Sequence, residues 1–553
     1  MAIVWYEWGA EAFARAHRES KPILLSLTAA WCHACRQMDA ETWDHPGVEA
    51  LVERSVVPVK VDADRRPDLY GRYHLGGLPT TVLLTSQAGF VRGGTFLSPP
   101  QFMGFLNDGL TTFRTGRRPL PRSAGRRVRT VPPSPEGFAA AQVAAVERRY
   151  DPEHAGFALA PKLPHPETLT FLLRQHPATP DAQRMAIRSL EAIADHLWDT
   201  GAGGFFRYAA GRDWSQPHTE KLAVDQAALI RLFLEAGSRL GSPRFLGLGR
   251  GAVEYALGWL AGPEGVFFGS QAADPSYYAL RPAERAREEP PAVDRLGYAD
   301  ATAAMASALT YAAAVLELPQ WQARALTAVD RLMRLVPPVP LPHLLLGPSP
   351  VSGWLRDQAL GIQAAVDAYR VSGRAACLRW AGQLAEWALS HLWDEEHEAF
   401  RDLPGDPGPG GGKGPVFTPV VANALMAEAL AELGGLERES PFGEWAARLL
   451  TTLMTKTDGS VAAPAVALAL LRGQGATVEA ELAGEPHTAE AQALARAVIR
   501  ECGPRVRLRW VPGPGPAVTL CTPEACLPPL ETGRDLAESL RTLGLSLRSG
   551  HSL

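Results

Sequence analysis

Apolar and polar residues follow two different patterns along the chain, and the change of pattern divides it into regions. Short, continuous apolar runs at 22–28, 56–62 and 80–84 are typical of buried strands. Helical character follows the first run, and a helix-like segment at 98–110 follows the last. Strands that alternate with helices predict a small α/β domain at residues 1–114.

Beyond residue 135 the apolar positions recur at helical spacing, and strand signals almost disappear. Several helical stretches end in similar aromatic and glycine-containing turns, first at 150–157 and again at 198–205. Residues 136–472 would hold six helical hairpins of roughly 56 residues each. We therefore predict an all-α (α/α)6 toroid with these turns on one rim. The helical stretches are 137–149, 181–197, 221–237, 246–259, 300–316, 321–335, 360–370, 375–392, 420–433 and 441–454.

Two further segments flank the predicted toroid. Residues 115–135 are rich in Pro and Arg, have no periodicity and predict a linker. Residues 473–553 return to strand and helix signals and predict a small C-terminal α/β module. Within the toroid, the Gly-rich segment 404–415 lacks the context of a phosphate-binding loop, and we interpret it as a flexible insertion.

Composition and charge exclude several classes of protein. A net charge of −4 gives no reason to expect nucleic acid as a partner. The N-terminus lacks the pattern of a signal peptide, and no apolar run of about 18 residues predicts a membrane span. Six cysteines in 553 residues do not make a disulfide scaffold, so we expect a cytosolic protein that keeps its thiols reduced.

Two of these cysteines, Cys32 and Cys35, form a C-x-x-C motif between a predicted strand and a predicted helix. The positive end of the helix dipole favours the thiolate of Cys32, which can then attack a disulfide. Cys35, one turn into the helix, can resolve the mixed disulfide. His33 would add positive charge and lower the pKa of Cys32 further.

Other interpretations of the motif remain open. Haem attachment requires a histidine directly after the second cysteine, and this chain has Arg36 there. Zinc requires two more ligands, and Cys521 and Cys526 belong to a distant module, so we expect no metal. Two buried structural thiols are also compatible with the motif. Cys377 lies in an apolar helical stretch and is expected to be a core thiol, whereas Cys521 and Cys526 could pair, act as a second redox site or remain free.

Residues 21–110 resemble thioredoxin throughout. Trp31 precedes the cysteine pair, Pro79 lies in a segment similar to the cis-proline loop, and Gly93-Gly94 resembles the glycine turn before the last helix. The resemblance implies that backbone groups at Pro79 pair with an extended substrate beside the cysteines. Ser26 departs from the pattern, because thioredoxins carry a buried acid there.

A wider resemblance covers nearly the whole chain. The chain resembles the spermatogenesis-associated, thioredoxin-domain-containing family, which implies a thioredoxin-like domain joined to a six-hairpin, glycosidase-like barrel. Around 270–276 relatives carry an acidic motif from which Ala272 and Pro275 depart, and a Trp-Asn pair found in relatives near 298–302 is missing. The matching segments are 21–43, 60–68, 156–164, 203–208, 217–226 and 521–528.

The matched segments of the barrel supply candidates for ligand binding. A sugar site needs aromatic faces and pairs of carboxylates or histidines for acid–base chemistry. The alternative interpretation is that the charged residues among them form ion pairs between neighbouring hairpins. The candidates are Arg207, Tyr208, His218, Glu220, Lys221 and Asp225.

Together these patterns favour one function and leave two alternatives. The leading hypothesis is a thiol–disulfide oxidoreductase module, fused to a barrel that binds or processes a carbohydrate-like ligand. Its partners would be a protein or small-molecule disulfide and a carbohydrate-like ligand, with no cofactor. The alternatives are a sugar epimerase, isomerase or glycosidase-like enzyme with a structural thioredoxin-like domain, and a non-catalytic binding protein.

Overall fold

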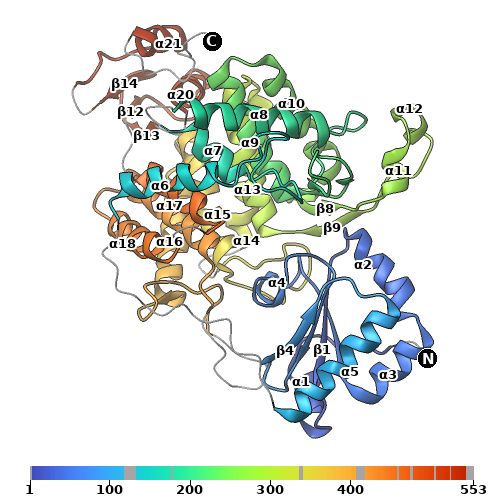
Figure 1. The fold of residues 1–553 in the computed structure, drawn as a ribbon. Coiled ribbons are helices and arrows are strands. Elements are labelled where there is room, and N and C mark those ends of the chain that lie inside the picture. The colour runs from blue at the N-terminus through green and yellow to red at the C-terminus, as the bar shows by residue number, and fades with distance from the viewer. Residues whose placement is uncertain are drawn as a thin grey trace.

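The chain folds into an N-terminal α/β domain, a central toroid of helices and a small C-terminal module (Figure 1). None of the described helices is both long enough and apolar enough to cross a membrane. The predicted linker falls mostly on 117–132, outside the described residues, as does most of the Gly-rich segment 404–415. The computed structural model describes residues 3–116, 133–175, 179–335, 340–405, 417–457, 460–473, 478–503, 506–522 and 525–542.

The N-terminal domain is built on a sheet with strand order β2-β1-β3-β4. Strand β1 is parallel to β2 and antiparallel to β3, so the three predicted apolar runs are neighbouring strands, with β1 between the other two. Helices α1 and α4 pack on one face, and α2, α3 and α5 on the other. The elements are β1 (Ile23–Thr28), β2 (Val57–Asp62), β3 (Thr80–Leu84), β4 (Phe90–Gly94), α1 (Ala10–Arg18), α2 (His33–Met38), α3 (Pro46–Ser55), α4 (Pro67–Tyr73) and α5 (Pro99–Thr115).

Strand β4 differs from the expectation for its glycines. Gly93 and Gly94 do not form a turn before the last helix but pair with Val82 and Thr81 inside the sheet. A Cβ atom at Gly93 would lie 2.4 Å from the end of the Leu75 side chain, so any larger residue would force this side chain to move. The glycine pair therefore reflects packing rather than chain reversal.

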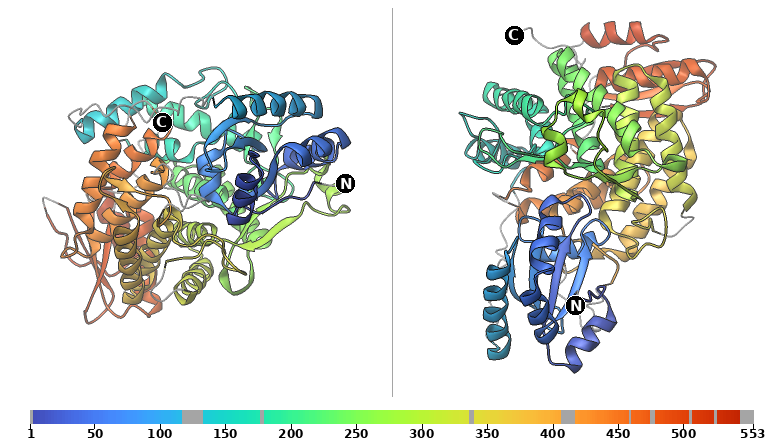
Figure 2. Two further views of the ribbon diagram at one scale, coloured as in Figure 1. Left: turned by 90° about the horizontal axis from the view of Figure 1, so that it is seen from below. Right: turned by 90° about the vertical axis from the view of Figure 1, so that its right-hand side faces the viewer.

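The toroid consists of two concentric rings of described helices. Each inner helix packs against the next, and the last, α19, packs against the first, α7, which closes the ring. Figure 2 shows these helices from two further directions. This arrangement is the predicted (α/α)6 toroid. The inner helices are α7 (Pro166–Leu173), α9 (Ala223–Leu240), α13 (Ala299–Val315), α15 (Leu355–Ser372), α17 (Val420–Leu436) and α19 (Ala463–Gly473). The outer helices are α6 (Pro135–Glu147), α8 (Pro180–His196), α10 (Pro243–Tyr255), α14 (Pro319–Leu335), α16 (Ala375–His391) and α18 (Phe442–Lys456).

Charged residues complement the dipoles of the inner helices at both ends of the toroid. Acidic residues occupy the first turns of four of these helices: Glu167, Asp225, Asp300 and Asp357. Basic residues lie at or just beyond the last turns of four: Arg174, Arg239, Arg370 and Arg472. We call the end with the helix N-termini the mouth. The opposite end is closed by ion pairs such as Arg174–Glu235, 2.7 Å long, around a cavity of about 40 Å³.

The toroid contains strands that the sequence pattern did not predict. Strands β7 (Lys221–Leu222), β8 (Phe268–Gln271) and β9 (Val293–Gly297) form a small sheet, and two short helices, α11 (Pro275–Ala279) and α12 (Pro282–Arg285), project between β8 and β9 (Figure 1). The expectation that strands are almost absent is wrong here, because strands of two to five residues leave no measurable alternation. Two shorter hairpins pair β5 (Tyr208–Ala209) with β6 (Pro217–His218), and β10 (Trp393–Asp394) with β11 (Ala399–Phe400).

The C-terminal module is a three-stranded sheet with order β13-β12-β14, covered by two helices. Cys521, the last residue of β14, forms a disulfide with Cys526. Cys377 is a buried free cysteine of the toroid, as expected. The elements of the module are β12 (Val478–Ala483), α20 (Ala489–Cys502), β13 (Val506–Val511), β14 (Ala517–Cys521) and α21 (Gly533–Thr542).

Candidate functional site

The redox pair lies where β1 leads into α2, as the motif predicts. Cys32 caps the N-terminus of α2, and the backbone N–H of Cys35 donates a hydrogen bond of 3.1 Å to the Cys32 sulfur. The two cysteines form a disulfide, and only 5% and 3% of their surfaces are exposed. The Leu78–Pro79 peptide bond is cis, and Leu78 packs on the same cluster as the cysteines.

The disulfide faces the toroid rather than open solvent. Leu222 and Ala272, which belong to the strand region of the toroid, pack against the cluster that contains both cysteines. The backbone N–H of Ala273 donates a hydrogen bond of 3.0 Å to the Trp31 carbonyl. The Arg36 side chain, in turn, donates a hydrogen bond to the Ala273 carbonyl. The redox motif is therefore part of the interface between the two domains.

Arg207 connects the redox motif to the candidate residues of the toroid. Its guanidinium carbon lies 4.4 Å from the centre of the Trp31 ring, within the range of a cation–π interaction. The same guanidinium lies 3.6 Å from the Glu220 carboxylate and 4.0 Å from that of Asp225. Burial raises the pKa of both carboxyl groups, although Arg207 opposes this shift. Both carboxyls are thus held closer to neutrality than exposed ones.

Tyr208 and His218 lie beside Arg207 on the hairpin formed by β5 and β6. Their rings stack with centroids 4.1 Å apart and planes inclined by 14°. Burial lowers the pKa of His218, and the positive charges of Arg207 and His33 lower it further. His33 belongs to the redox motif, so this interaction links a candidate residue of each domain.

Lys221 lies apart from this group. Its ammonium group donates hydrogen bonds of 2.7 Å to Asp199 and to the Gly203 carbonyl, and it lies 4.4 Å from the centre of the Tyr255 ring. The side chain is fully buried, and burial lowers its pKa to about 8. In this position Lys221 forms an internal ion pair and does not face the other five candidates.

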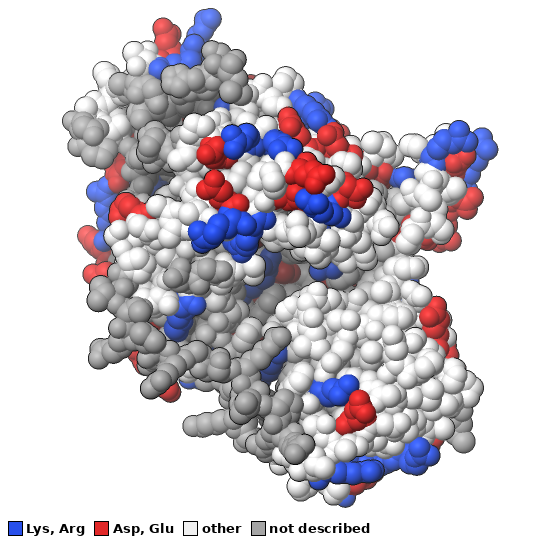
Figure 3. Space-filling view, in the orientation of Figure 1, with Lys and Arg blue, Asp and Glu red and all other residues white. Residues whose placement is uncertain are grey.

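Other charged groups at the mouth were not identified from the sequence. Arg356, next to Asp357 in the first turn of α15, lies 3.5 Å from Asp300. Glu167, in the first turn of α7, is exposed to water, and the pKa of its carboxyl is raised by the surrounding protein. Figure 3 shows a recess between the N-terminal domain and the toroid, with side chains of both charges along it.

His343 links the toroid to the N-terminal domain. One ring nitrogen, Nδ1, lies 3.1 Å from both carboxylate oxygens of Asp357, and the other, Nε2, lies 2.7 Å from the Asp64 carbonyl. Burial lowers the pKa of His343, but the Asp357 carboxylate outweighs it and raises the pKa to about 9. The raised pKa favours the protonated ring, which donates from both nitrogens.

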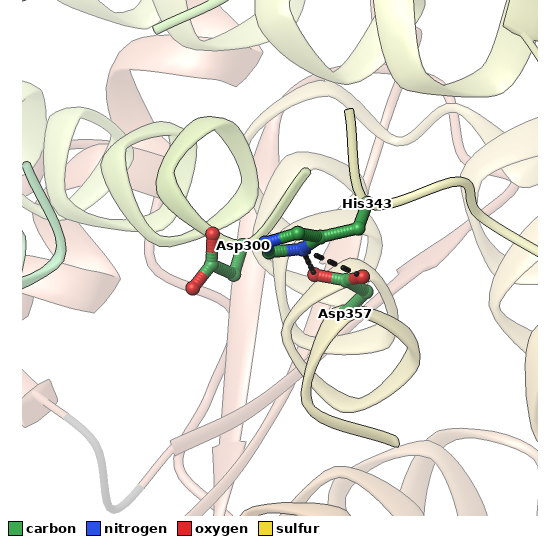
Figure 4. A group of neighbouring side chains, drawn as sticks. All are labelled: Asp300, His343 and Asp357. Carbon is green, nitrogen blue, oxygen red and sulfur yellow. Dashed lines mark hydrogen bonds and ion pairs between the residues drawn. The ribbon is translucent and has the colours of Figure 1, made fainter. Parts of the chain in front are cut away.

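The group formed by Asp300, His343 and Asp357 contains the residue types that bind metals (Figure 4). A metal ligand needs a free lone pair on the imidazole ring. Both ring nitrogens of His343 are engaged by protein acceptors, and Asp300 pairs with Arg356. In this arrangement the three residues form a group of hydrogen bonds and ion pairs at the contact between the two domains.

Asp64 extends this group to the redox motif. Its carboxylate accepts a hydrogen bond of 2.8 Å from the Trp31 indole N–H. Burial and the charge of Asp62 raise the pKa of Asp64 to about 7. Asp64 lies within the matched segment 60–68, but no sequence signal pairs it with His343, 279 residues away.

We expect the Trp31 indole N–H resonance to titrate with a midpoint near pH 7, since Asp64 ionises there. The pKa of Asp64 is higher in the folded protein than in the unfolded chain. The free energy of unfolding that this group contributes is therefore lost as the pH rises through about 7. NMR of ¹⁵N-tryptophan-labelled protein, with Trp31→Phe for assignment, measures the midpoint. Asp64→Asn should abolish the titration, whereas Asp44→Asn at an exposed position should preserve it. A titration that survives in Asp64→Asn would contradict the assignment.

Comparison with known proteins finds relatives of parts of this chain. Residues 1–113 match the Thioredox_DsbH family, described as a protein of unknown function, DUF255. Spermatogenesis-associated protein 20 of Homo sapiens is 32% identical over 326 residues, which cover 51% of this chain and 41% of that protein. The chain thus spans less than half the length of the curated relatives it matches.

Two solved structures resemble separate parts of the chain. A D-mannose isomerase matches 57% of this chain and 85% of its own, with 11% identity and a TM-score of 0.46. A DsbH oxidoreductase matches 20% of this chain and 86% of its own, with 18% identity and a TM-score of 0.19. The chain carries a Thioredox_DsbH domain at its N-terminus and is homologous to spermatogenesis-associated protein 20.

Proposed function

We propose that this protein is a thiol–disulfide oxidoreductase whose redox pair acts together with a polar site at the mouth of the toroid. The observation that carries the proposal is the position of the Arg207 guanidinium, 4.4 Å from the Trp31 ring. Through this contact the candidate residues of the toroid lie beside those of the redox motif, although Arg207 and Cys32 are 175 positions apart in the sequence. We call this place the composite site: Trp31, Cys32, His33 and Cys35 with Arg207, Tyr208, His218, Glu220 and Asp225.

The N-terminal half of the composite site supplies the redox chemistry. In the reduced protein, the end of α2 and the charge of a protonated His33 would favour the thiolate of Cys32. The thiolate attacks a substrate disulfide, and Cys35 then resolves the mixed disulfide. The return of the pair to the dithiol form needs an external thiol reductant, which a reducing compartment such as the cytoplasm would supply.

The toroid half supplies groups for binding a polar ligand. Glu220 and Asp225, with raised pKa values, can donate or accept hydrogen bonds with hydroxyl groups. The stacked rings of Tyr208 and His218 offer an aromatic surface beside them. These groups suit a carbohydrate-like ligand. We propose that the functional unit comprises residues 1–114 and 136–472, with 115–135 as a linker and 473–553 as an appended module.

The proposal predicts that a change in the toroid slows chemistry in the N-terminal domain. Arg207→Met should lower the second-order rate of oxidation of the reduced protein by hydroxyethyl disulfide about tenfold, because the charge beside Trp31 is lost. Alkylation and mass spectrometry measure this rate in single-turnover experiments. Arg281→Met, in a side chain that is 85% exposed, is the matched control.

Two outcomes would count against parts of this proposal. An unchanged rate for Arg207→Met would show that the two halves act separately. Isothermal titration calorimetry with a hexose such as D-mannose tests whether the toroid binds a carbohydrate. Binding that is weakened by Glu220→Gln would support a ligand site in the toroid. If no hexose tested gives a heat of binding, the carbohydrate ligand is ruled out.

A further inference from the structure

We propose that the substrate of the composite site is a small, non-protein disulfide, because the segment Ala272–Ala273 occupies the place beside Cys32 that a polypeptide substrate would need. This inference rests on the proposed oxidoreductase function. It concerns which class of disulfide reaches the redox pair.

The segment is bound to the N-terminal domain through its main chain. The Ala273 N–H donates to the Trp31 carbonyl at 3.0 Å, and the Ala273 carbonyl accepts from Arg36. Ala272 packs on the cluster that contains Cys32 and Cys35. Recognition of extended chains depends on such main-chain hydrogen bonds, with side chains in adjacent pockets. The toroid therefore places a piece of its own chain against the redox motif, and this piece obstructs an extended protein substrate on that side of the cysteines.

The segment is also hydrogen-bonded to other parts of the toroid, so its position is fixed on both sides. The Ala272 N–H donates a hydrogen bond of 2.8 Å to the Ala292 carbonyl, and the Asp274 N–H donates to the Thr219 hydroxyl at 3.2 Å. Strand β8, which leads into the segment, pairs with both β7 and β9. Displacement by a substrate chain would break several of these hydrogen bonds, each of which contributes about 1 kcal/mol.

A different side of the site remains accessible to water. The side chains of Arg207, His218 and Asp225 are 29%, 42% and 41% exposed, and His33 is exposed next to them. These are side-chain surfaces of mixed charge, and they suit a compact molecule with hydroxyl, carboxylate or amine groups. The substrate class is therefore a low-molecular-weight disulfide with a polar body.

The reaction balances without a further cofactor. The Cys32 thiolate attacks one sulfur of R–S–S–R′, a bond forms between Cys32 and the RS sulfur, and R′S⁻ leaves and takes up a proton. The Cys35 thiolate then attacks the Cys32 sulfur and releases RS⁻, which is protonated in turn. The sum is one protein dithiol plus one disulfide giving one protein disulfide plus two thiols.

The test compares a small disulfide with a protein disulfide on the full-length chain. Protein is fully reduced, freed of reductant and mixed with hydroxyethyl disulfide or with insulin, and oxidation of Cys32 and Cys35 is followed by alkylation and mass spectrometry. Rates are normalised to those of free dithiothreitol with the same two disulfides. We expect the wild type to favour the small disulfide over insulin by about 100-fold, which corresponds to the loss of a few hydrogen bonds.

Variants of the segment decide whether it is the cause. Ala272→Glu places a charge against the redox cluster. Ala273→Pro removes the N–H group that donates a hydrogen bond to the Trp31 carbonyl. Each should raise the insulin rate about fivefold, because Ala273→Pro loses a hydrogen bond of about 1 kcal/mol and Ala272→Glu disrupts the apolar packing of the segment on the redox cluster. The rate with hydroxyethyl disulfide should stay within about threefold. Ala283→Glu, on the exposed arm helix α12, is the matched control and should change neither rate.

Failure of this inference is distinct from failure of the proposed function. Equal normalised rates for insulin and hydroxyethyl disulfide in the wild type would overturn the inference and leave the oxidoreductase intact. Insulin rates that stay low in both Ala272→Glu and Ala273→Pro, in variants with native circular dichroism, would also overturn it. Oxidation by neither disulfide in any form would instead refute the proposed function.

Discussion

Cys32→Ser is expected to lower the rate of disulfide exchange by about 1,000-fold or more, because a serine hydroxyl is not ionised at neutral pH and cannot replace the attacking thiolate. Cys32 caps α2 and is the member of the pair placed at the positive end of the helix dipole. The single-turnover assay with hydroxyethyl disulfide measures this loss. Cys35→Ser should instead accumulate the mixed disulfide on Cys32, since the resolving thiol is missing.

The control for this experiment is another cysteine of the same chain. Cys377 is free and buried in α16, and burial raises its pKa, so Cys377→Ala should keep the wild-type rate. Substantial activity remaining in Cys32→Ser would transfer the redox function to the second disulfide, Cys521–Cys526. The double variant Cys521→Ser/Cys526→Ser would then lose the remaining activity.

Lys221→Met is expected to destabilise the protein by about 3–5 kcal/mol, the range for removing one partner of a buried ion pair. Lys221 and Asp199 are both fully buried, and the substitution leaves the Asp199 carboxylate with only Arg285 as a cationic partner. Equilibrium unfolding in urea measures the change. Arg250→Met, which breaks an exposed pair with Glu254, should change stability by about 0.5 kcal/mol or less.

The same variant separates the two interpretations of Lys221. If Lys221 is an internal ion pair, Lys221→Met will keep its rate of disulfide exchange at a temperature where it is folded. A variant with unchanged stability and weakened ligand binding would instead show that Lys221 contributes to ligand binding, as the sequence predicts. Stability and activity measurements on Lys221→Met together decide whether Lys221 has a structural role or a role in binding.

Local features of the chain could be predicted because their signals are local. Three strands of the N-terminal sheet are short, largely apolar runs, and the position of Cys32 between strand and helix follows from a four-residue motif. The long helices of the toroid carry many periodic residues. Helix α7 was missed because it has only eight residues and begins after His165, a residue in the left-handed conformation.

The composite site could be predicted only in parts. Both of its halves were recognised as motifs, yet their adjacency depends on how one domain packs on the other. The hydrogen bond from His343 to Asp64 and that from Ala273 to Trp31 join residues separated by more than 200 positions. Neither hydropathy nor spacing carries information about such pairs. The sheet formed by β7, β8 and β9, which holds Ala272 in place, was missed for the different reason that its strands are too short to show a period.

The position of Arg207 over Trp31 has a consequence for how the two halves of the site find each other. Both belong to one polypeptide, so their encounter is a first-order event that does not depend on protein concentration. Tethering of this kind gives effective local concentrations that reach the millimolar range for short flexible connections. Two separate proteins at micromolar abundance would need a tight affinity for each other to be paired as often. Because the N-terminal domain and the toroid belong to one chain, their interface does not need the tight affinity that two separate proteins would require.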